Sequence, residues 1–479
     1  MLYDTVILHA RILDGSGGPD AAGHVAITDG QIVAVGELDT HAAREVIDAR
    51  DKVLAPGFID THTHDDIVVI RAPEMLPKLS QGVTTVIAGN CGISAAPFAA
   101  AQPPDPMPLL GTPDTFRYPR FREYVQAIDV ARPAVNVASF VGHTTLRGTH
   151  MHGDFDRAAT ASEIALMREQ LAESLDAGAL GLSTGLAYAA AYSAPASEVL
   201  ALAQGLDAAG ARYATHLRSE FADVLDAMDE AFAIGTQAPA PVIVSHLKCA
   251  GVSNWGRSGE LLDSLERAGR TSDVGCDCYP YTASSSLLDL KQVTDEIDIL
   301  ITWSTPHPTA GGRLLATIAT EWGVPQLEAA QRLQPAGAVY HCMSEADVQR
   351  ILRHPASMIG SDGLPNDPHP HPRLWGTFPR VLGHYSRDLG LFPLTEAVRK
   401  MTGLAASRFG LHDRGLVRPG YRADLVLFDP GTIADTATYE QPIRAATGIE
   451  AVWVNGVLSY RHGQATGARA GRFLPRSES

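Results

Sequence analysis

A short apolar run that ends in a His-x-His pair constrains this chain more than any other feature. The run reads Gly57-Phe58-Ile59-Asp60-Thr61-His62-Thr63-His64. Side chains two residues apart on a strand point to the same face, so one strand end can present both imidazoles to a single metal ion. The alternative is a pair of unrelated surface histidines, and the rest of the chain argues against it.

Four more residues of metal-ligand type lie at strand-like sites that are well separated in the sequence. They are Cys91, His216, His246 and Asp362. Each residue alone is weak evidence for a metal site, because most single histidines and cysteines are ordinary core or surface residues. A metal centre at the mouth of a barrel, however, takes its ligands from the ends of different strands. In the order His-x-His, Cys, His, His, Asp, the six residues form a coherent site for divalent metal.

Several longer stretches resemble a known family. They are Ser80-Gln81-Gly82-Val83-Thr84-Thr85-Val86, Gly89-Asn90-Cys91-Gly92-Ile93-Ser94, Ala214-Thr215-His216-Leu217-Arg218, Ile359-Gly360-Ser361-Asp362-Gly363-Leu364-Pro365, and His371 to Arg380. The chain resembles the N-acyl-D-amino-acid deacylases (D-aminoacylases) of the amidohydrolase superfamily, from its first strand to about Gly456. The superfamily usually bridges two metals with a carboxylated lysine, whereas this subgroup has a cysteine there. None of the five lysines follows an apolar strand as Cys91 does.

Zinc is the expected metal, since a thiolate with two imidazoles is a sound zinc ligand set. We therefore expect Cys91, His216 and His246 to form the tight site. The resemblance implies the same trio, with His62 and His64 forming a second, weaker site that shares Cys91. Asp362 is expected beside the metals, where it takes a proton from the attacking water and delivers it to the departing amine. Its alternative role is that of an N-cap or turn aspartate next to Gly363.

The carboxylate of a substrate would need cationic and hydroxyl donors close to the metal. Lys248 follows His246 by two residues and would face the same way on a strand. Arg373 offers a bidentate fork, and Tyr279 a hydroxyl. The resemblance implies that these three hold the amino-acid carboxylate, and a fixed carboxylate could select the D centre. The alternatives are a structural salt bridge for Arg373 and a packed aromatic ring for Tyr279.

Side-chain preference is expected to depend on Ser285 and Met343, which match family positions at the side-chain pocket. A methionine there suits apolar D-residues such as methionine, leucine or phenylalanine, because its thioether adapts to varied shapes. An acidic D-residue would require another cation, and Arg218, Arg147 and Arg380 are the candidates that the sequence leaves open.

Two further patterns are assigned structural roles. His143 is expected to be a hydrogen-bonded core histidine. Cys276 and Cys278 form a C-x-C pair without a second pair nearby, and we do not assign it to metal binding.

Composition fits a large enzyme. The chain has 479 residues, and 54 Asp and Glu against 38 Lys and Arg give a net charge of -16, which argues against a nucleic-acid partner. The five cysteines are too few for a disulfide framework, and the first residues lack the pattern of a secretory signal. No apolar run approaches the length needed to cross a bilayer. We therefore expect a cytoplasmic protein, monomeric or a small homo-oligomer, that acts on a small molecule.

The expected fold is α/β. Residues 1–53 and 420–479 are rich in short β patterns and are predicted to form one small β-sandwich from both ends of the chain. Residues 54–419 alternate apolar strands with helices, as in a TIM-like (β/α)8 barrel. One helix is expected to start at a capping box, Thr160 to Glu163, and another to cover 197–209. Residues 284–340 are too long for a simple loop and are read as an inserted, lid-like subdomain with a helix at 325–333.

The function expected from these features is zinc-dependent hydrolysis of the amide bond of N-acyl-D-amino acids. The acyl group is expected to be acetyl and the D-residue apolar. N-acyl-D-glutamate or N-acyl-D-aspartate deacylase is an alternative. Cyclic amide hydrolysis is disfavoured, because those relatives generally carry the bridging lysine. A non-catalytic barrel scaffold is also disfavoured, because it would have no need of the complete ligand set.

Overall fold

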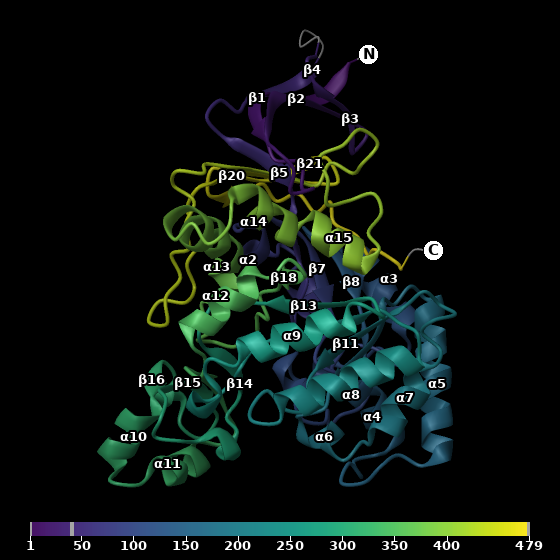
Figure 1. Ribbon diagram of the computed structural model, residues 1–479, viewed down its shortest axis with the longest axis vertical. Helices are drawn as coiled ribbons and strands as arrows, with labels where there is room; N and C mark the ends of the chain where they lie inside the picture. Colours follow the sequence, from purple (N-terminus) through teal and green to yellow (C-terminus); the bar gives the residue numbers. More distant parts are fainter. Residues whose placement is uncertain (1, 39–42, 477–479) are drawn as a thin grey trace.

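The computed structural model describes residues 2–38 and 43–476. A β-rich end carries the N-terminus, and a larger body of strands surrounded by helices lies below it (Figure 1). The predicted terminal unit also included residues 1, 39–42 and 477–479, which lie outside the described residues. No helix in the described ranges is both long enough and apolar enough to cross a membrane.

Both ends of the chain contribute to one nine-stranded sheet. Its order is β22-β21-β20-β19-β5-β1-β2-β3, with β4 also paired to β1. The strands are β1 (Tyr3–Ile12), β2 (Ala21–Thr28), β3 (Gln31–Gly36), β4 (Ala43–Asp48), β5 (Val53–Pro56), β19 (Leu425–Phe428), β20 (Ile449–Val454), β21 (Val457–Arg461) and β22 (Gln464–Ala465). The antiparallel pairing of β5 with β19 joins the two ends. Apolar side chains from both, such as Ile7 and Trp453, share one buried cluster.

Nine short strands form two parallel sheets, of order β6-β7-β8 and β18-β13-β12-β11-β10-β9. They are β6 (Phe58–Asp60), β7 (Val83–Ala88), β8 (Asn136–Ser139), β9 (Val141–Gly142), β10 (Gly181–Gly185), β11 (Arg212–His216), β12 (Val242–Val244), β13 (Val274–Cys278) and β18 (Ser357–Ile359). Almost every residue in them is buried, as expected for parallel strands covered on both faces. Thr61 N donates to Ile359 O at 3.4 Å, which links the end of β6 to β18.

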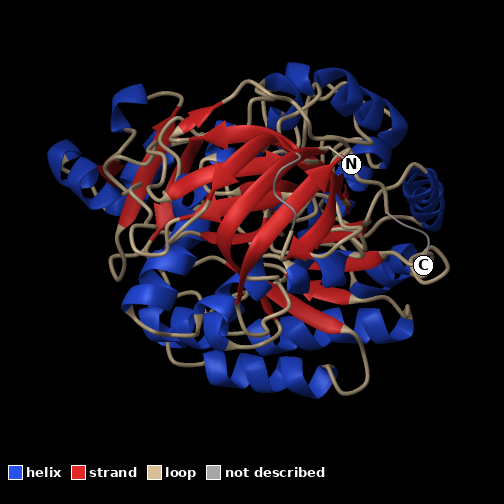
Figure 2. Cartoon of the chain, turned by 90° about the horizontal axis from the view of Figure 1, so that it is seen from above, coloured by secondary structure: helices blue, strands red, loops and turns tan. Residues whose placement is uncertain are grey.

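Helices surround these strands, as the view from above shows (Figure 2). The longer ones are α3 (Phe121–Ala131), α4 (His143–His150), α5 (Ala161–Asp176), α7 (Ala196–Ala203), α8 (Val224–Gln237), α9 (Ser258–Ala268), α12 (Glu345–Arg353), α13 (Arg373–Arg380), α14 (Leu394–Met401) and α15 (Gly403–Phe409). The shorter ones are α1 (Val68–Arg71), α2 (Leu76–Leu79) and α6 (Ala189–Tyr192), and a π-helical segment, Val381–Asp388, continues α13.

Two helix predictions had different outcomes. The capping box is present: Glu163 N donates to Thr160 Oγ1, and Thr160 N donates to Glu163 Oε2. The helix predicted over 197–209 was too long, because α7 ends at Ala203 and turns occupy the following residues. Apolar residues such as Leu206 remain buried in these turns, and this burial extended the helical pattern beyond the helix itself.

The segment from Ser284 to Tyr340 forms an antiparallel sheet of its own, with the order β14-β17-β15-β16. Its elements are β14 (Ser284–Leu287), β15 (Ile299–Ser304), β16 (Arg313–Leu314), α10 (Leu315–Trp322), α11 (Gln326–Leu333) and β17 (Ala336–Tyr340). Helix α11 confirms the helix expected at 325–333. The helices α10 and α11 project to the lower left of the molecule (Figure 1).

Candidate metal centre

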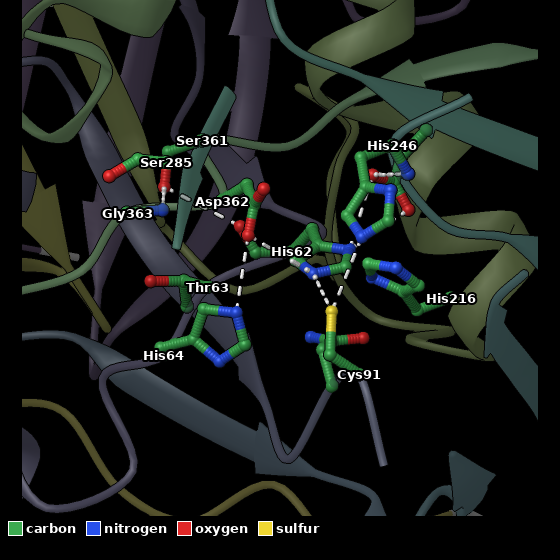
Figure 3. A network of polar contacts seen from close by, with 12 residues as sticks. His62, Thr63, His64, Cys91, His216, His246, Ser285, Ser361, Asp362 and Gly363 are labelled. Atoms are coloured by element: carbon green, nitrogen blue, oxygen red, sulfur yellow. Dashed lines mark hydrogen bonds and ion pairs between the residues drawn. The ribbon is translucent and has the colours of Figure 1, made fainter. Parts of the chain in front are cut away.

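The predicted ligands meet at the carboxyl ends of the parallel strands (Figure 3). His62 and His64 follow β6, Cys91 follows β7, His216 ends β11, His246 follows β12, and Asp362 follows β18. All six side chains are buried or nearly so. They form two groups whose ligand atoms lie within 4.8 Å of one another, one of His62, His64, Cys91 and Asp362 and one of Cys91, His216 and His246. Cys91 belongs to both groups.

The distances around Cys91 suit a tetrahedral metal. Cys91 Sγ lies 3.2 Å from His62 Nε2 and 3.3 Å from His246 Nε2. Zinc–sulfur and zinc–nitrogen bonds of about 2.3 and 2.0 Å would place tetrahedral ligand atoms about 3.5 Å apart. In each of the two groups, therefore, the spacing matches a thiolate and an imidazole that bind the same ion.

One imidazole nitrogen supports the same conclusion. His216 Nδ1 is buried and has no hydrogen-bond partner among the described residues, whereas His64 faces Asp362 with its Nε2 and its unpaired Nδ1 points away. A buried polar atom without a partner is costly, so such atoms call for an occupant. A metal ion is an occupant that fits this thiol and imidazole donor set.

The electrostatics of the centre favour an ionised thiol. Burial raises the pKa of the Cys91 thiol, but the imidazoles of His62 and His246 outweigh burial and hold this pKa well below its ordinary value. Burial likewise lowers the pKa of His62, and the Cys91 and Asp277 side chains outweigh it and raise that pKa. A thiolate is the form of cysteine that binds metals.

Backbone geometry aims three of these side chains into the centre. Cys91, His246 and Asp362 have φ angles of 54°, 37° and 48°, in the left-handed region that residues other than glycine rarely adopt. Such conformations cost about 1–3 kcal/mol each and cluster at functional sites. Close packing supports this geometry, since a Cβ on Gly360 would lie only 2.5 Å from His62 Cβ.

Asp362 lies between an imidazole and a guanidinium. Its Oδ1 is 3.1 Å from His64 Nε2, and its Oδ2 is 2.9 Å from Arg373 Nη1. Burial raises the pKa of Asp362, but Arg373 and His64 outweigh burial and hold it well below its ordinary value. The carboxylate is therefore ionised at neutral pH and available to accept a proton.

A cavity of about 960 Å³ opens onto this centre. His64, His216, His246, Asp362 and Lys248 are among the residues that line it, together with Tyr279 and Ser285. Two of these lining residues, Tyr279 and Ser285, have a hydroxyl that is buried without a hydrogen-bond partner among the described residues. Arg373 Nε is unpaired in the same way; Arg373 is not a lining residue, but its Nη2 donates to Ser285 O at 3.3 Å. Unpaired donors beside a cavity indicate a polar ligand that would complete them.

The predicted substrate residues lie together around the Tyr279 ring. Lys248 Nζ is 5.6 Å and Arg373 Cζ 4.6 Å from its centroid. Lys248 is not on a strand as expected, because β12 ends at Val244, but its Nζ still lies 2.8 Å from His246 Nδ1. Met343 is buried and, with Lys248 and Tyr279, lines a small enclosed space beside the centre.

The remaining candidates have other partners. His143 is buried, with Nε2 3.0 Å from Glu198 Oε1, which confirms it as a hydrogen-bonded core histidine. Arg147 pairs with the same Glu198, Arg218 pairs with Glu230 through two nitrogens, and Arg380 pairs with Asp435. Cys276 Sγ lies 3.3 Å from Ser357 Oγ.

Comparison with known proteins identifies the family. The model of the amidohydrolase family matches residues 45–298 and 312–460. The chain belongs to the amidohydrolase family. D-aminoacylase of Alcaligenes xylosoxydans xylosoxydans is 48% identical over 475 residues, which cover 99% of this chain and 98% of the relative.

Two further relatives also match this chain over almost its whole length. N-acyl-D-aspartate deacylase of the same organism is 50% identical over 98% of this chain and 95% of its own length. The crystal structure of N-acyl-D-glutamate deacylase from Bordetella bronchiseptica, complexed with zinc and a phosphonate inhibitor, superimposes with a TM-score of 0.96. It is 44% identical and covers 100% of both chains. These matches confirm the resemblance: within the amidohydrolase family, the chain is a member of the N-acyl-D-amino-acid deacylases.

Two carboxylates of this amidohydrolase were missed by the sequence analysis. Asp277 Oδ1 lies 3.3 Å from His62 Nδ1 and accepts a hydrogen bond of 2.9 Å from His246 N. Glu220 Oε1 lies 2.9 Å from His246 Nδ1 and 2.5 Å from Lys248 Nζ. Carboxylates of this kind orient metal-binding imidazoles. Asp277 lies on β13 next to its carboxyl end, which is the signal that could have identified it.

Proposed function

We propose that this chain hydrolyses the amide bond of N-acyl-D-amino acids and yields a carboxylate and a free D-amino acid. The observation that carries the proposal is the buried thiol and imidazole set around Cys91, with ionised Asp362 beside it. The names of the full-length relatives, which are deacylases of N-acyl-D-amino acids, support the same reaction.

Zinc is the proposed cofactor. Cys91, His216 and His246 would hold it tightly, and His62 and His64 would form a weaker site that shares Cys91 and lies next to Asp362. When bound, zinc lowers the pKa of a water molecule to about 7 and polarises a carbonyl oxygen. The zinc in the crystal structure of the N-acyl-D-glutamate deacylase supports this choice.

Asp362 is the proposed proton carrier. In the first half of the reaction its carboxylate accepts the proton of the attacking water. In the second half the same carboxyl group donates this proton to the nitrogen of the departing amine. Its ion pair with Arg373 and its contact with His64 hold the carboxylate at the cavity wall, where the amide would lie.

Arg373, Tyr279 and Lys248 are proposed to hold the amino-acid carboxylate. The unpaired Arg373 Nε and Tyr279 OH are donors of the kind that a carboxylate would complete. With the carboxylate fixed at one end and the amide at the metal, only one configuration at Cα directs its side chain into the pocket. Ser285 and Met343 are the proposed residues of this pocket, which we expect to favour D-methionine, D-leucine and D-phenylalanine.

Acidic D-residues are a second candidate class. Arg147, Arg218 and Arg380 are engaged by carboxylates elsewhere. Lys291, however, is exposed along the same cavity, with Nζ 5.7 Å from the centroid of Tyr192. This lysine could pair with the side-chain carboxylate of N-acyl-D-aspartate or N-acyl-D-glutamate.

A substrate panel distinguishes these classes. The zinc-loaded enzyme would be assayed on the N-acetyl derivatives of D-methionine, D-leucine, D-aspartate and D-glutamate, and on a hydantoin. Apolar preference predicts the highest kcat/KM for D-methionine or D-leucine. Preference for the acidic pair, lost selectively in Lys291→Met, would assign the second class instead. Turnover of the hydantoin alone would reject the proposal.

The proposed architecture is a barrel with a smaller unit. We infer that β6, β7, β8 with β9, β10, β11, β12, β13 and β18 form one closed (β/α)8 barrel within residues 54–419, supported by the link from β6 to β18. Residues 1–53 and 420–479 would form the β-sandwich, and 284–340 a lid-like insertion whose Ser285 reaches the cavity. The five free thiols suit the reducing cytoplasm.

A further inference from the structure

A buried lysine contacts the residues next to the predicted metal ligands but none of the ligands themselves. Lys78, on α2, is fully buried. Its Nζ lies 2.7 Å from Asp60 Oδ2, 3.1 Å from Asp65 Oδ2, 3.1 Å from Thr63 Oγ1 and 3.0 Å from Ser361 Oγ. Lysine is rarely fully buried unless it is paired, and here it has partners for all three of its protons.

The partners of Lys78 alternate with functional residues on two segments. Asp60, Thr63 and Asp65 flank His62 and His64, and Ser361 precedes Asp362. Figure 3 shows Thr63, Ser361 and Gly363 around the His64–Asp362 contact.

The same two segments are also joined without the lysine. Asp362 N donates to His62 O at 2.7 Å, and His64 N donates to Gly363 O at 3.2 Å. Asp60 strengthens the link, because it accepts hydrogen bonds from Ser361 N at 2.7 Å and from Ser361 Oγ at 2.6 Å. Lys78 adds a cation where both segments meet, because the side chains that it contacts there are carboxylates and hydroxyls.

We propose that Lys78 is a positioning residue, which fixes His62 and His64 against Asp362 through Asp60, Thr63, Asp65 and Ser361. It touches neither the cavity nor the ligand atoms. We expect Lys78 to affect the positions of His62, His64 and Asp362. In the trio of Cys91, His216 and His246, His246 is contacted by Asp277 and Glu220, and of these two carboxylates Asp277 also contacts His62.

Charge explains why a neutral residue cannot take this place. Burial lowers the pKa of Lys78, but Asp60 and Asp65 outweigh burial and raise it, so the side chain is a cation at neutral pH. Without it, two buried carboxylates would lie uncompensated beside the histidines, and breaking a buried pair is strongly destabilising. The two segments would then lose their fixed spacing.

Lys78→Met tests this role, with Lys400→Met as the matched control. Lys400 is also fully buried, but its Nζ donates to the carbonyls of His354 and Ser357, at the opposite end of β18 from Asp362. Each folded variant would be assayed well below its Tm on N-acetyl-D-methionine, or on the best substrate of the panel. Each would also be titrated with Co²⁺, whose thiolate absorption reports the Cys91 site.

Lys78→Met is expected to lower kcat about tenfold or more and to change KM less than about threefold, since the residues proposed to bind the carboxylate are untouched. The first equivalent of Co²⁺ should bind as in the wild type, and the second about tenfold more weakly. Lys400→Met should lower the Tm and leave kcat and both Co²⁺ equivalents unchanged. A folded Lys78→Met variant with wild-type kcat and wild-type Co²⁺ binding would overturn the proposal, as would equal losses in the control.

Should Lys78→Met fail to fold, the double variant Asp65→Asn with Lys78→Met keeps the net charge of the cluster and should show the same pattern. Failure of both to fold would assign Lys78 to stability alone and overturn the positioning role. The kinetic part of this test rests on the proposed function, because it requires deacylase activity. A wild-type protein without deacylase activity would reject the function, while the Co²⁺ titration would still decide the role of Lys78.

Discussion

Arg373 and Asp362 form a buried ion pair at the metal centre, with Nη1 and Oδ2 2.9 Å apart. The pair joins the group proposed to bind the substrate carboxylate to the group proposed to carry the proton. The Arg373 guanidinium is also the charge that lowers the pKa of Asp362, so a substrate carboxylate bound to Arg373 would contact the group that keeps Asp362 ionised. In the proposed mechanism, substrate binding and proton transfer would therefore be coupled through one guanidinium.

Replacement of Arg373 by methionine should alter both binding and pH dependence. Burial raises the pKa of Asp362, and Arg373 is the main group that lowers it. Without Arg373 this pKa rises, so Asp362 stays protonated to higher pH and the acidic limb of the kcat profile moves to higher pH. KM should rise about tenfold or more through loss of a charged hydrogen bond. Profiles of kcat and KM between pH 5 and 9 measure both effects.

Arg380→Met is the control for that variant, because Arg380 lies at the other end of α13 and pairs with Asp435. Its acidic limb should match the wild type. If the acidic limb of the kcat profile is unchanged in Arg373→Met, Asp362 is not the group whose ionisation limits turnover.

Cys91→Ser should remove the tight metal. A serine hydroxyl does not ionise near neutral pH and is a harder, weaker ligand for zinc than a thiolate. Zinc retained after dialysis should fall well below one equivalent, and kcat/KM should fall more than about 100-fold. Cys276→Ser is the matched control, since Cys276 is equally buried but contacts Ser357. Full zinc retention in Cys91→Ser would reject the thiolate as a ligand.

Asp277→Asn should weaken metal binding without removing a ligand. Asp277 lies 3.3 Å from His62 Nδ1 and accepts a hydrogen bond from His246 N. The asparagine keeps the shape but loses the charge that orients His62, and metal affinity should fall about 10- to 100-fold. Calorimetric titration with zinc measures the change. Affinity equal to the wild type in a variant with unchanged circular dichroism would exclude this orienting role.

Much of the site could be predicted because its residues share one local signature. His62, Cys91, His216, His246 and Asp362 each end or follow a short apolar strand, and parallel strands gather such ends at one edge. Their roles as ligands and proton carrier stay predictions. The same reasoning anticipated β-rich termini, and the strands of both termini do share one sheet.

The surroundings of the ligands could not be predicted in the same way. Lys78 lies on a four-residue helix with no chemical motif, and Glu220 lies in a loop. Their partners are brought to them only by the fold, as Ser361 is to Lys78 across 283 residues. The left-handed conformations of Cys91, His246 and Asp362 carry no signal either, because such strain depends on the packing around it.

The most direct measurement compares N-acetyl-D-methionine with N-acetyl-L-methionine. Release of methionine would be followed for the metal-free protein, the zinc-loaded protein and zinc-loaded Asp362→Asn, with the zinc content of each determined. The proposed mechanism predicts release of D-methionine alone, only with zinc, and a loss of kcat of about 1,000-fold or more in Asp362→Asn at unchanged content of tightly bound zinc. Equal hydrolysis of both enantiomers, or full activity in the metal-free protein or in Asp362→Asn, would contradict it.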